Sequence, residues 1–447
     1  MFLSGGISVA PWDTEKLGEQ TYPSPLHLSH RRGDLIANFI DDDARILVDH
    51  DWHRMQACCK SGDPPAYFEV AGPRSRLFFD PESVRAAIVT CGGLCPGLND
   101  VIRALVMQLH YHYGVHEILG IRYGFHGMTI THGGTAIPLT PGVVENIHTE
   151  GGSFLGSSRG PQSPVEIVDF LQRRGINMLF TVGGDGTLRG AQAILKECQS
   201  RNYEASVIGI PKTIDNDILY IDRSFGFFTA VEKAAEVLGC AHVEARGARN
   251  GIGLVKLMGR YSGFITARAT LASGFVNFVL IPEVPFQLEG SNGFLNHLKD
   301  RLKKRGHAVI AVSEGAGQDL ISGSRPETDP SGNPKLKDIG VYLKNRISDC
   351  LEAEKIPFSV KYFDPSYIIR STPANTEDNV YCTELAQNAV HAAFAGRTGI
   401  VVGSWHNQFV MIPLSLVTSG RKSVDPDGPE WLAVLQNTGQ PNVMTDG

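Results

Sequence analysis

The stretch from Thr181 to Asp217 constrains the fold of this 447-residue chain more than any other. It overlaps the apolar run 177–182 and contains the apolar run 206–210. Both runs are short, contain β-branched residues and are bounded by Gly or Pro, as is typical of buried parallel strands. Glycines and Asp185 follow the first run, and a lysine, a threonine and two further carboxylates follow the second. Neighbouring parallel strands end at one edge of a sheet, where α/β folds bind ligands. The stretch therefore predicts a glycine cradle and carboxylates suited to phosphate and a divalent cation.

The composition excludes several functional classes. The chain is 42% hydrophobic and 20% charged, as soluble globular proteins are, and its length allows two or three domains. A net charge of −6 argues against a nucleic-acid partner, since it implies no broad basic surface. No apolar run approaches the ~18 residues of a membrane span. The start MFLSGGISV lacks the features of a secretion signal and the end lacks Ser-Lys-Leu, so we expect a cytoplasmic location. The eight cysteines show no short repeated spacing, which fits thiols that stay reduced there.

Strand–helix alternation from Arg85 onward predicts an α/β fold with two Rossmann-like lobes, each a mainly parallel sheet with helices on both faces. We assign residues 81–228 and 368–415 to a first, nucleotide-binding lobe, and 229–367 to a second, sugar-phosphate-binding lobe. Residues 1–80 are rich in Pro, His and Asp and weakly periodic. We expect them to form an N-terminal extension on the surface or at a subunit interface, or a partly ordered tail. Residues 416–447 are expected to form a C-terminal tail.

Hydrophobic periodicity predicts the remaining elements. Predicted strands are 86–90, 117–124, 251–258, 278–283, 307–315, 358–365, 399–405 and 408–414. Predicted helices are 100–109, 229–240, 295–305, 338–354 and 377–395, and a turn is predicted at 365–375.

Two loops are candidate phosphate contacts. The glycine turn at 92–97 lies between a strand and a helix, so its backbone N–H groups and the helix dipole would attract an anion. It is neither a Walker loop nor a GxGxxG turn, and a tight packing turn is the alternative. Arg159 lies in the small-residue loop GGSFLGSSRGPQSP, through which an arginine can approach a phosphate. A solvated arginine is the alternative there.

Phosphoryl transfer requires positioning, charge neutralisation and a carboxylate beside the attacking hydroxyl. Asp185, in a glycine-rich turn, can ligate Mg²⁺ together with substrate phosphates. Asp215, flanked by Thr213 and Asp217, is the candidate for the carboxylate beside the hydroxyl. A second cluster at predicted strand ends would hold a phosphorylated, polyhydroxylated acceptor: Arg260, Glu314, Lys361, Tyr367 and Arg370.

Seven motifs occur in the order found in 6-phosphofructokinases: VTCGGLCPGLN, SSRGP, GGDGT, PKTIDND, MGRYSG, SEGAGQD and PSYIIR. Over roughly residues 85–415 the chain resembles this family, and most of all its long ATP-dependent branch from trypanosomes and plants, which is related to the pyrophosphate-using enzymes. GGDGT alone also occurs in NAD kinases and lipid kinases, whereas PKTIDND and MGRYSG do not. The resemblance implies the phosphofructokinase fold and Mg²⁺-assisted transfer from ATP to the 1-hydroxyl of fructose 6-phosphate, giving fructose 1,6-bisphosphate.

The resemblance also implies a role for each matched residue. Nucleotide-phosphate contacts are expected from Gly92 or Gly93, Arg159, Gly160, Gly184, Asp185, Gly186, Thr187 and Lys212, with Asp185 as the Mg²⁺ ligand. Fructose 6-phosphate contacts are expected from Thr213, Ile214, Asp215, Met258, Gly259, Arg260, Glu314, Lys361, Tyr367 and Arg370. In this scheme Asp215 accepts the proton of the 1-hydroxyl and Arg260 stabilises the transferring charge.

Two positions bear on the phosphoryl donor. Pyrophosphate enzymes of the family typically carry an aspartate where this chain has Gly186, and that carboxylate obstructs and repels the nucleotide's α-phosphate. Lys212 instead resembles the pyrophosphate users, but a lysine can neutralise either donor. We favour ATP, because an obstructing carboxylate discriminates more sharply than an added contact. Pyrophosphate-dependent transfer is the alternative.

The subunit organisation is less constrained. The resemblance implies a homo-oligomer, either a tetramer or a dimer, with cooperativity and activation by a nucleotide such as AMP as expectations. Gly251 stands where short bacterial enzymes have an arginine that reaches the neighbouring sugar-phosphate pocket, and Tyr367 stands where they have a histidine. The neighbour's contribution is therefore left open. A catalytically inactive regulatory subunit is the rival from another class, and it predicts loss of Asp185, Asp215 or Arg260, all of which are present.

Overall fold

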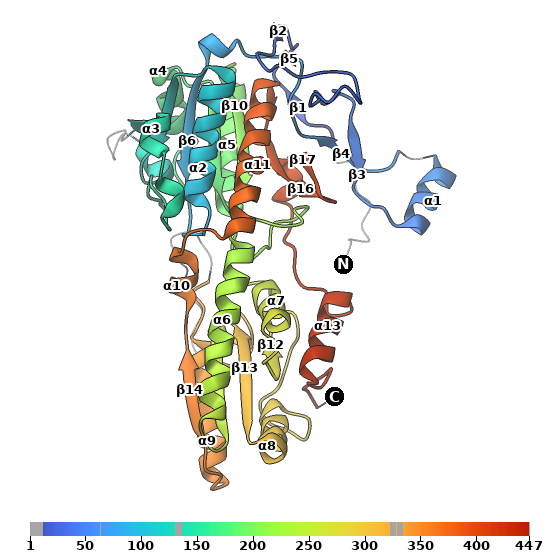
Figure 1. The fold of residues 1–447 in the computed structure, drawn as a ribbon, viewed down its shortest axis with the longest axis vertical. Coiled ribbons are helices and arrows are strands. Elements are labelled where there is room, and N and C mark those ends of the chain that lie inside the picture. Colours follow the sequence, from blue (N-terminus) through green and yellow to red (C-terminus); the bar gives the residue numbers. More distant parts are fainter. Residues whose placement is uncertain (1–11, 63, 130–135, 322–327, 329–333, 447) are drawn as a thin grey trace. The chain divides into compact units, whose positions relative to one another are not determined.

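A computed structural model of the chain describes residues 12–62, 64–129, 136–321, 328 and 334–446. The chain forms two compact units, which are drawn in Figure 1. The first contains residues 1–212, 218–225 and 379–421, and the second contains 213–217, 226–378 and 422–447. The first eleven residues of the predicted extension lie outside the described part of the chain.

The first unit is built on a nine-stranded sheet in the order β3-β4-β17-β16-β10-β9-β6-β7-β8. The strands, in that order, are Arg45–Leu47, Tyr67–Val70, Gln408–Pro413, Ile400–Trp405, Ser206–Pro211, Met178–Gly183, Arg85–Thr90, Glu117–Ile121 and Ala136–Pro138. The central strands β16, β10, β9, β6 and β7 are parallel, and the strands outside them pair antiparallel. The central strands are apolar on both faces, as sheets covered by helices require.

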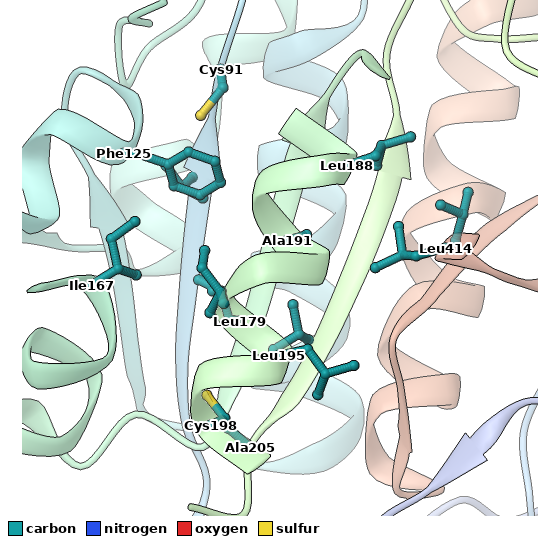
Figure 2. Packing of buried hydrophobic residues seen from close by; sticks show 14 of the residues in the cluster. Cys91, Phe125, Ile167, Leu179, Leu188, Ala191, Leu195, Cys198, Ala205 and Leu414 are labelled. Carbon is teal, nitrogen blue, oxygen red and sulfur yellow. The ribbon is translucent and has the colours of Figure 1, made fainter. Parts of the chain in front are cut away.

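Helices α4 (Pro164–Arg174) and α5 (Asp185–Ser200) pack against one face of this sheet, as Figure 2 shows. In α5 the buried residues Leu188, Ala191, Leu195 and Cys198 recur at three- and four-residue intervals, which places them on one side of the helix. They meet strand residues such as Leu179. The unit's other helices are α1 (Trp52–Ser61), α2 (Leu98–Met107), α3 (Pro141–Val144), α12 (Leu414–Val417) and most of α11 (Thr376–Phe394).

The predicted N-terminal extension contributes two strands to this sheet, which we did not expect. Strand β4 pairs with β17, and its residue Glu69 is 1% exposed. Arg397, in β15 (Arg397–Thr398), is fully buried and forms an ion pair with Glu69 at 2.8 Å. Further short pairings join β1 (Glu15–Lys16) to β15 and β2 (Tyr22–Pro23) to β5 (Arg76–Leu77). The segment is thus part of the first unit rather than an appendage on it.

The second unit contains a four-stranded parallel sheet in the order β12-β13-β11-β14. Its strands are Phe278–Leu280, His307–Ser313, Gly251–Leu257 and Ser359–Phe363. Helices α8 (Phe294–Arg305) and α9 (Ile339–Ala353) share a buried apolar cluster with one face. Helix α6 (Phe227–Arg246) packs so closely on β11 that a Cβ at Gly253 would lie 2.6 Å from the Ala241 carbonyl oxygen. The α/β fold is therefore confirmed, although the sheet of the first unit is mixed and only that of the second is parallel throughout.

Two predicted irregular segments of the second unit contain helices. The predicted turn at 365–375 begins with α10 (Ser366–Ser371), and the predicted tail contains α13 (Pro429–Thr438), whose Trp431 is buried. The unit also contains α7 (Phe264–Ser273). Throughout the described chain, every helix is too short or too polar to cross a membrane.

Candidate active site

In the first unit, three adjacent strands deliver the residues predicted to contact the nucleotide. Gly92 and Gly93 follow β6, Gly184 and Asp185 follow β9, and Lys212 follows β10. Because β10, β9 and β6 are neighbouring parallel strands, their carboxyl ends lie at the same edge of the sheet. The predicted convergence of these turns therefore occurs within this unit.

Lys212 links two of these turns directly. Its side chain is 7% exposed, and its Nζ atom donates a 2.6 Å hydrogen bond to the carbonyl oxygen of Gly93. A Cβ at Gly92, whose φ is +88°, would lie 3.1 Å from the same Nζ, and one at Gly93 would lie 3.1 Å from Nη2 of Arg159. Glycine at both positions therefore lets two cationic groups approach the turn. This arrangement suits a phosphorylated ligand.

Asp185 is the first residue of α5, and Gly186 is the second. The Asp185 carboxylate forms ion pairs with Arg189 at 3.0 Å and with Arg421 at 3.4 Å. A Cβ at Gly186 would meet no other atom within 4 Å, so this side of the helix start is open. Thr187 is buried, and its N–H donates to the Gly184 carbonyl oxygen.

The described ranges contain no group of three His, Cys, Asp or Glu side chains arranged to hold a metal ion. A preformed protein cage for a cation is therefore absent from that part of the chain. A single carboxylate beside an open glycine, as at Asp185, does fit Mg²⁺ that takes its other ligands from substrate phosphates and water. The guanidinium groups of Arg189 and Arg421 would have to move away from the Asp185 carboxylate for that cation to bind.

In the second unit, Asp215 has the environment expected of a general base. Its Oδ2 atom accepts a 3.4 Å hydrogen bond from the backbone N–H of Arg260. Its own N–H donates to the Thr213 hydroxyl, and its carbonyl oxygen accepts from the Ser262 hydroxyl at 2.9 Å. Its Oδ1 atom is buried and has no hydrogen-bond partner within the described chain. One carboxylate oxygen is thus held in place while the other is left for a ligand.

Electrostatics favour proton uptake by this carboxylate. Burial, and then the negative charges of Asp217 and Glu314, raise the pKa of Asp215 well above its usual range. The backbone N–H and the positive charge of Arg260 oppose that shift. A carboxylate whose pKa is raised toward neutrality is a stronger proton acceptor than an ordinary aspartate.

The ends of β11 and β13 bring further predicted residues together. Met258, Gly259 and Arg260 follow β11, and Glu314 follows the adjacent β13. Gly259 has a φ of +127°, which favours glycine. Burial raises the pKa of Glu314, while the charges of Arg260, Lys256 and Arg370 lower it.

The remaining predicted contacts are spread more widely. Tyr367 and Arg370 lie on α10, with the Arg370 guanidinium 4.5 Å from the centre of the Tyr367 ring, which is 72% exposed. Lys361 lies on β14 level with Gly253, four residues before the end of β11, or about 13 Å along the strand. The structure therefore does not bring Lys361 to the strand ends. Of the remaining predicted contacts, Ile214 is buried and Gly160 has a φ of +96°.

Residues 85–393 match the sequence model of the family described as Phosphofructokinase. The chain belongs to this family. It is 50% identical over 382 residues to the ATP-dependent 6-phosphofructokinase of Borreliella burgdorferi, covering 84% of this chain and 86% of that one. The corresponding enzyme of Trypanosoma brucei brucei is 46% identical over 377 residues, or 84% of this chain and 77% of that one. An ATP-dependent 6-phosphofructokinase from Arabidopsis thaliana, described as chloroplastic, is 52% identical over 374 residues, or 84% and 69%. The predicted resemblance to the plant and trypanosome branch is confirmed.

Solved phosphofructokinase structures share the fold. The pyrophosphate-dependent phosphofructokinase from Marinobacter aquaeolei superposes with a TM-score of 0.66, covering 79% of this chain and 91% of that one. Its sequence identity to this chain is 20%, so this likeness shows the fold alone.

Sequence reasoning missed three charged residues that lie beside the predicted site residues. Arg189 and Arg421 contact the Asp185 carboxylate. Lys256 lies near the end of β11, two residues before Met258. Lys256 had a usable signal, because it is the one charged residue in an otherwise apolar predicted strand. Arg421 had none, since it lies far from GGDGT in the sequence and meets Asp185 only in the folded unit.

Proposed function

We propose that this chain is an ATP-dependent 6-phosphofructokinase. It transfers the γ-phosphoryl group of ATP to the 1-hydroxyl of fructose 6-phosphate, and yields ADP and fructose 1,6-bisphosphate. The donor and the reaction are supported by relatives that carry this name at 46–52% identity over most of the chain. The observation that carries the chemistry is Asp215, with one carboxylate oxygen held and the other buried without a partner.

In the proposed reaction the chain supplies a base and positive charge. Asp215 Oδ1 takes the proton of the sugar's 1-hydroxyl as that oxygen attacks the γ-phosphorus. Arg260, whose backbone N–H orients Asp215, offers its guanidinium to the charge of the transferring group. Lys212 and Arg159, which approach the Gly92–Gly93 turn, balance the charge of the nucleotide phosphates. Mg²⁺ bound by Asp185 and those phosphates would neutralise charge on the donor.

The acceptor is held by the second unit in this proposal. Glu314 accepts hydrogen bonds from sugar hydroxyls, and Tyr367 and Arg370 on α10 bind the 6-phosphate. Thr213, whose hydroxyl donates to Asp217 at 2.7 Å, holds the segment that contains the base. Lys361 would join the 6-phosphate contacts only if the bound sugar phosphate extends along β14. A cytoplasmic location and a homo-oligomer remain predictions.

Transfer from pyrophosphate is the second candidate, and Lys212 is the residue that keeps it open. Gly186 favours ATP, because its open Cβ position leaves room where a carboxylate would stand. The test is formation of fructose 1,6-bisphosphate from fructose 6-phosphate and Mg²⁺ with either ATP or pyrophosphate. Product with ATP alone supports the proposal. Product with pyrophosphate alone would overturn the donor, and no product with either would favour a regulatory subunit.

A further inference from the structure

Lys256 is an almost buried cation in the middle of the second unit's sheet. It lies on β11 among apolar neighbours, and its side chain is 12% exposed. Its Nζ atom lies 2.8 Å from Oδ2 of Asp364 and 3.1 Å from Oδ2 of Asp338. One ammonium group is therefore held between two carboxylates. The proposed reaction assigns no role to any of the three.

Both carboxylates fix the start of a helix. Asp364 Oδ1 accepts hydrogen bonds from the backbone N–H and the hydroxyl of Ser366, at 3.2 and 2.6 Å, where α10 begins. Asp338 Oδ1 accepts from the backbone N–H of Val341 at 3.1 Å, in the first turn of α9. Each aspartate thus contacts its helix through one oxygen and Lys256 through the other, and Asp338 Oδ1 also accepts a 3.2 Å hydrogen bond from the Tyr362 hydroxyl. The lysine joins the starts of two helices to the central strand.

Helix α10 depends on such support. It has six residues, and only Ile369 among them is buried, so neither its length nor its packing holds it firmly. Tyr367 and Arg370 project from this short helix, and the Arg370 guanidinium lies over the Tyr367 ring. A shift at Asp364 would move both side chains together. The positions of these two proposed phosphate contacts are therefore tied to Lys256.

Lys256 is also charged under all ordinary conditions. Burial lowers its pKa, but hydrogen bonds with Asp364 and Asp338 outweigh that effect and raise its pKa above the usual range. Hydrogen bonding to Lys256 helps to lower the pKa of both aspartates, although burial opposes this. The same positive charge favours the ionised form of Glu314. Lys256 thus acts on a proposed sugar contact as well as on α10.

We infer, on the basis of the proposed function, that Lys256 is a positioning residue of the fructose 6-phosphate site. It holds Asp364, and through it α10, so that Tyr367 and Arg370 meet the sugar's phosphate without rearrangement. Its loss would weaken sugar-phosphate binding selectively, since Lys212, Asp185 and the glycine turns belong to the other unit.

The test is the variant Lys256→Met, which keeps the side-chain length and removes the charge. We expect its KM for fructose 6-phosphate to rise about tenfold or more, while its KM for ATP and its kcat change by less than about threefold. The matched control is Lys299→Met. Lys299, on α8, is 16% exposed and pairs with Glu354 in the same unit, and neither residue is a proposed site residue, so its variant should keep both KM values within about twofold.

A second pair of variants separates the two aspartates. Asp364→Asn should reproduce the rise in KM for fructose 6-phosphate, whereas Asp338→Asn, which affects α9, should change it much less. The double variant Lys256→Met/Asp364→Asn should be no worse than the poorer single variant, because both changes remove the same link. Asp364→Asn decides the question if Lys256→Met unfolds at the assay temperature.

The inference is overturned if Lys256→Met behaves like Lys299→Met, or if it raises the KM of both substrates equally. Additive effects in the double variant would also overturn it. These outcomes are read in an active enzyme and leave the proposed function intact. If the unaltered chain forms no fructose 1,6-bisphosphate, the proposed function fails and the inference fails with it.

Discussion

Replacing Gly186 by aspartate tests the assignment of the nucleotide site and of the donor in one step. Gly186 is the second residue of α5, and a Cβ there meets nothing within 4 Å, so the new side chain fits without a clash. A carboxylate in the first turn of a helix changes stability by only about 0.3–1 kcal/mol. The variant should therefore fold and melt close to the unaltered protein.

The expected effect on the donor follows from charge. A carboxylate about 4 Å from a nucleotide phosphate costs about 4 kcal/mol at an effective dielectric constant of about 20. Screening by salt and water at this exposed position reduces that value, so we expect kcat/KM for ATP to fall by about 10²–10³-fold. The binding of fructose 6-phosphate alone, measured by calorimetry, should not change.

A matched control is available in the same unit. Gly142 is the second residue of α3, and a Cβ there is equally unobstructed. Gly142→Asp adds the same charge at another helix start, and should leave kcat/KM for ATP unchanged. If Gly186→Asp also keeps its kcat/KM for ATP within about threefold of the unaltered enzyme, then Gly186 does not face the nucleotide, and the reasoning on donor choice is refuted.

Two further predictions concern buried charges. Asp215→Asn should lower kcat by about 10²–10⁴-fold yet raise the melting temperature at neutral pH, because burial raises the pKa of Asp215 and its ionised form opposes folding. That gain should vanish below about pH 4, where the carboxyl is protonated in both states, and equal melting temperatures at neutral pH would contradict this account. Arg397→Met should lower the free energy of unfolding by about 3–5 kcal/mol, since it removes the nearer charge partner of buried Glu69 and leaves it with the more distant Arg45, at 3.7 Å. Arg85→Met, which breaks an exposed pair, should lower it by less than about 1 kcal/mol in the same denaturation series, and similar losses in both would disprove the role of burial.

The sequence predicted those elements whose cause is local. Strand β11 was recognised because a run of apolar residues, bounded by glycine, is what a buried parallel strand requires. The turns after β9 and β10 were placed correctly because neighbouring parallel strands end at one edge. Asp215 was selected from its motif, but the hydrogen bond that holds its Oδ2 atom comes from the backbone of Arg260, which only folding brings to it.

The features that were missed arise from distant contacts or from mixed signals. Strands β3 and β4 are short and weakly patterned, and they exist as strands because β17 pairs with β4, which in turn pairs with β3. Helix α10 begins at Ser366 directly after Pro365, two residues that favour a turn in isolation, and hydrogen bonds from Ser366 to the Asp364 carboxylate hold the start of the helix. No local sequence pattern predicts that Arg421 forms an ion pair with Asp185.

The strand order of the first unit has a consequence for synthesis on the ribosome. Strands β3 and β4 are made before the other strands of this sheet, yet they join the sheet only through β17, which is made after all of them. Until then β10 lacks its neighbour β16 and presents an open edge to other chains. A prematurely terminated chain should therefore aggregate or be degraded rather than persist as a partly active fragment. Synthesis of β16 and β17 is therefore the step that completes the sheet.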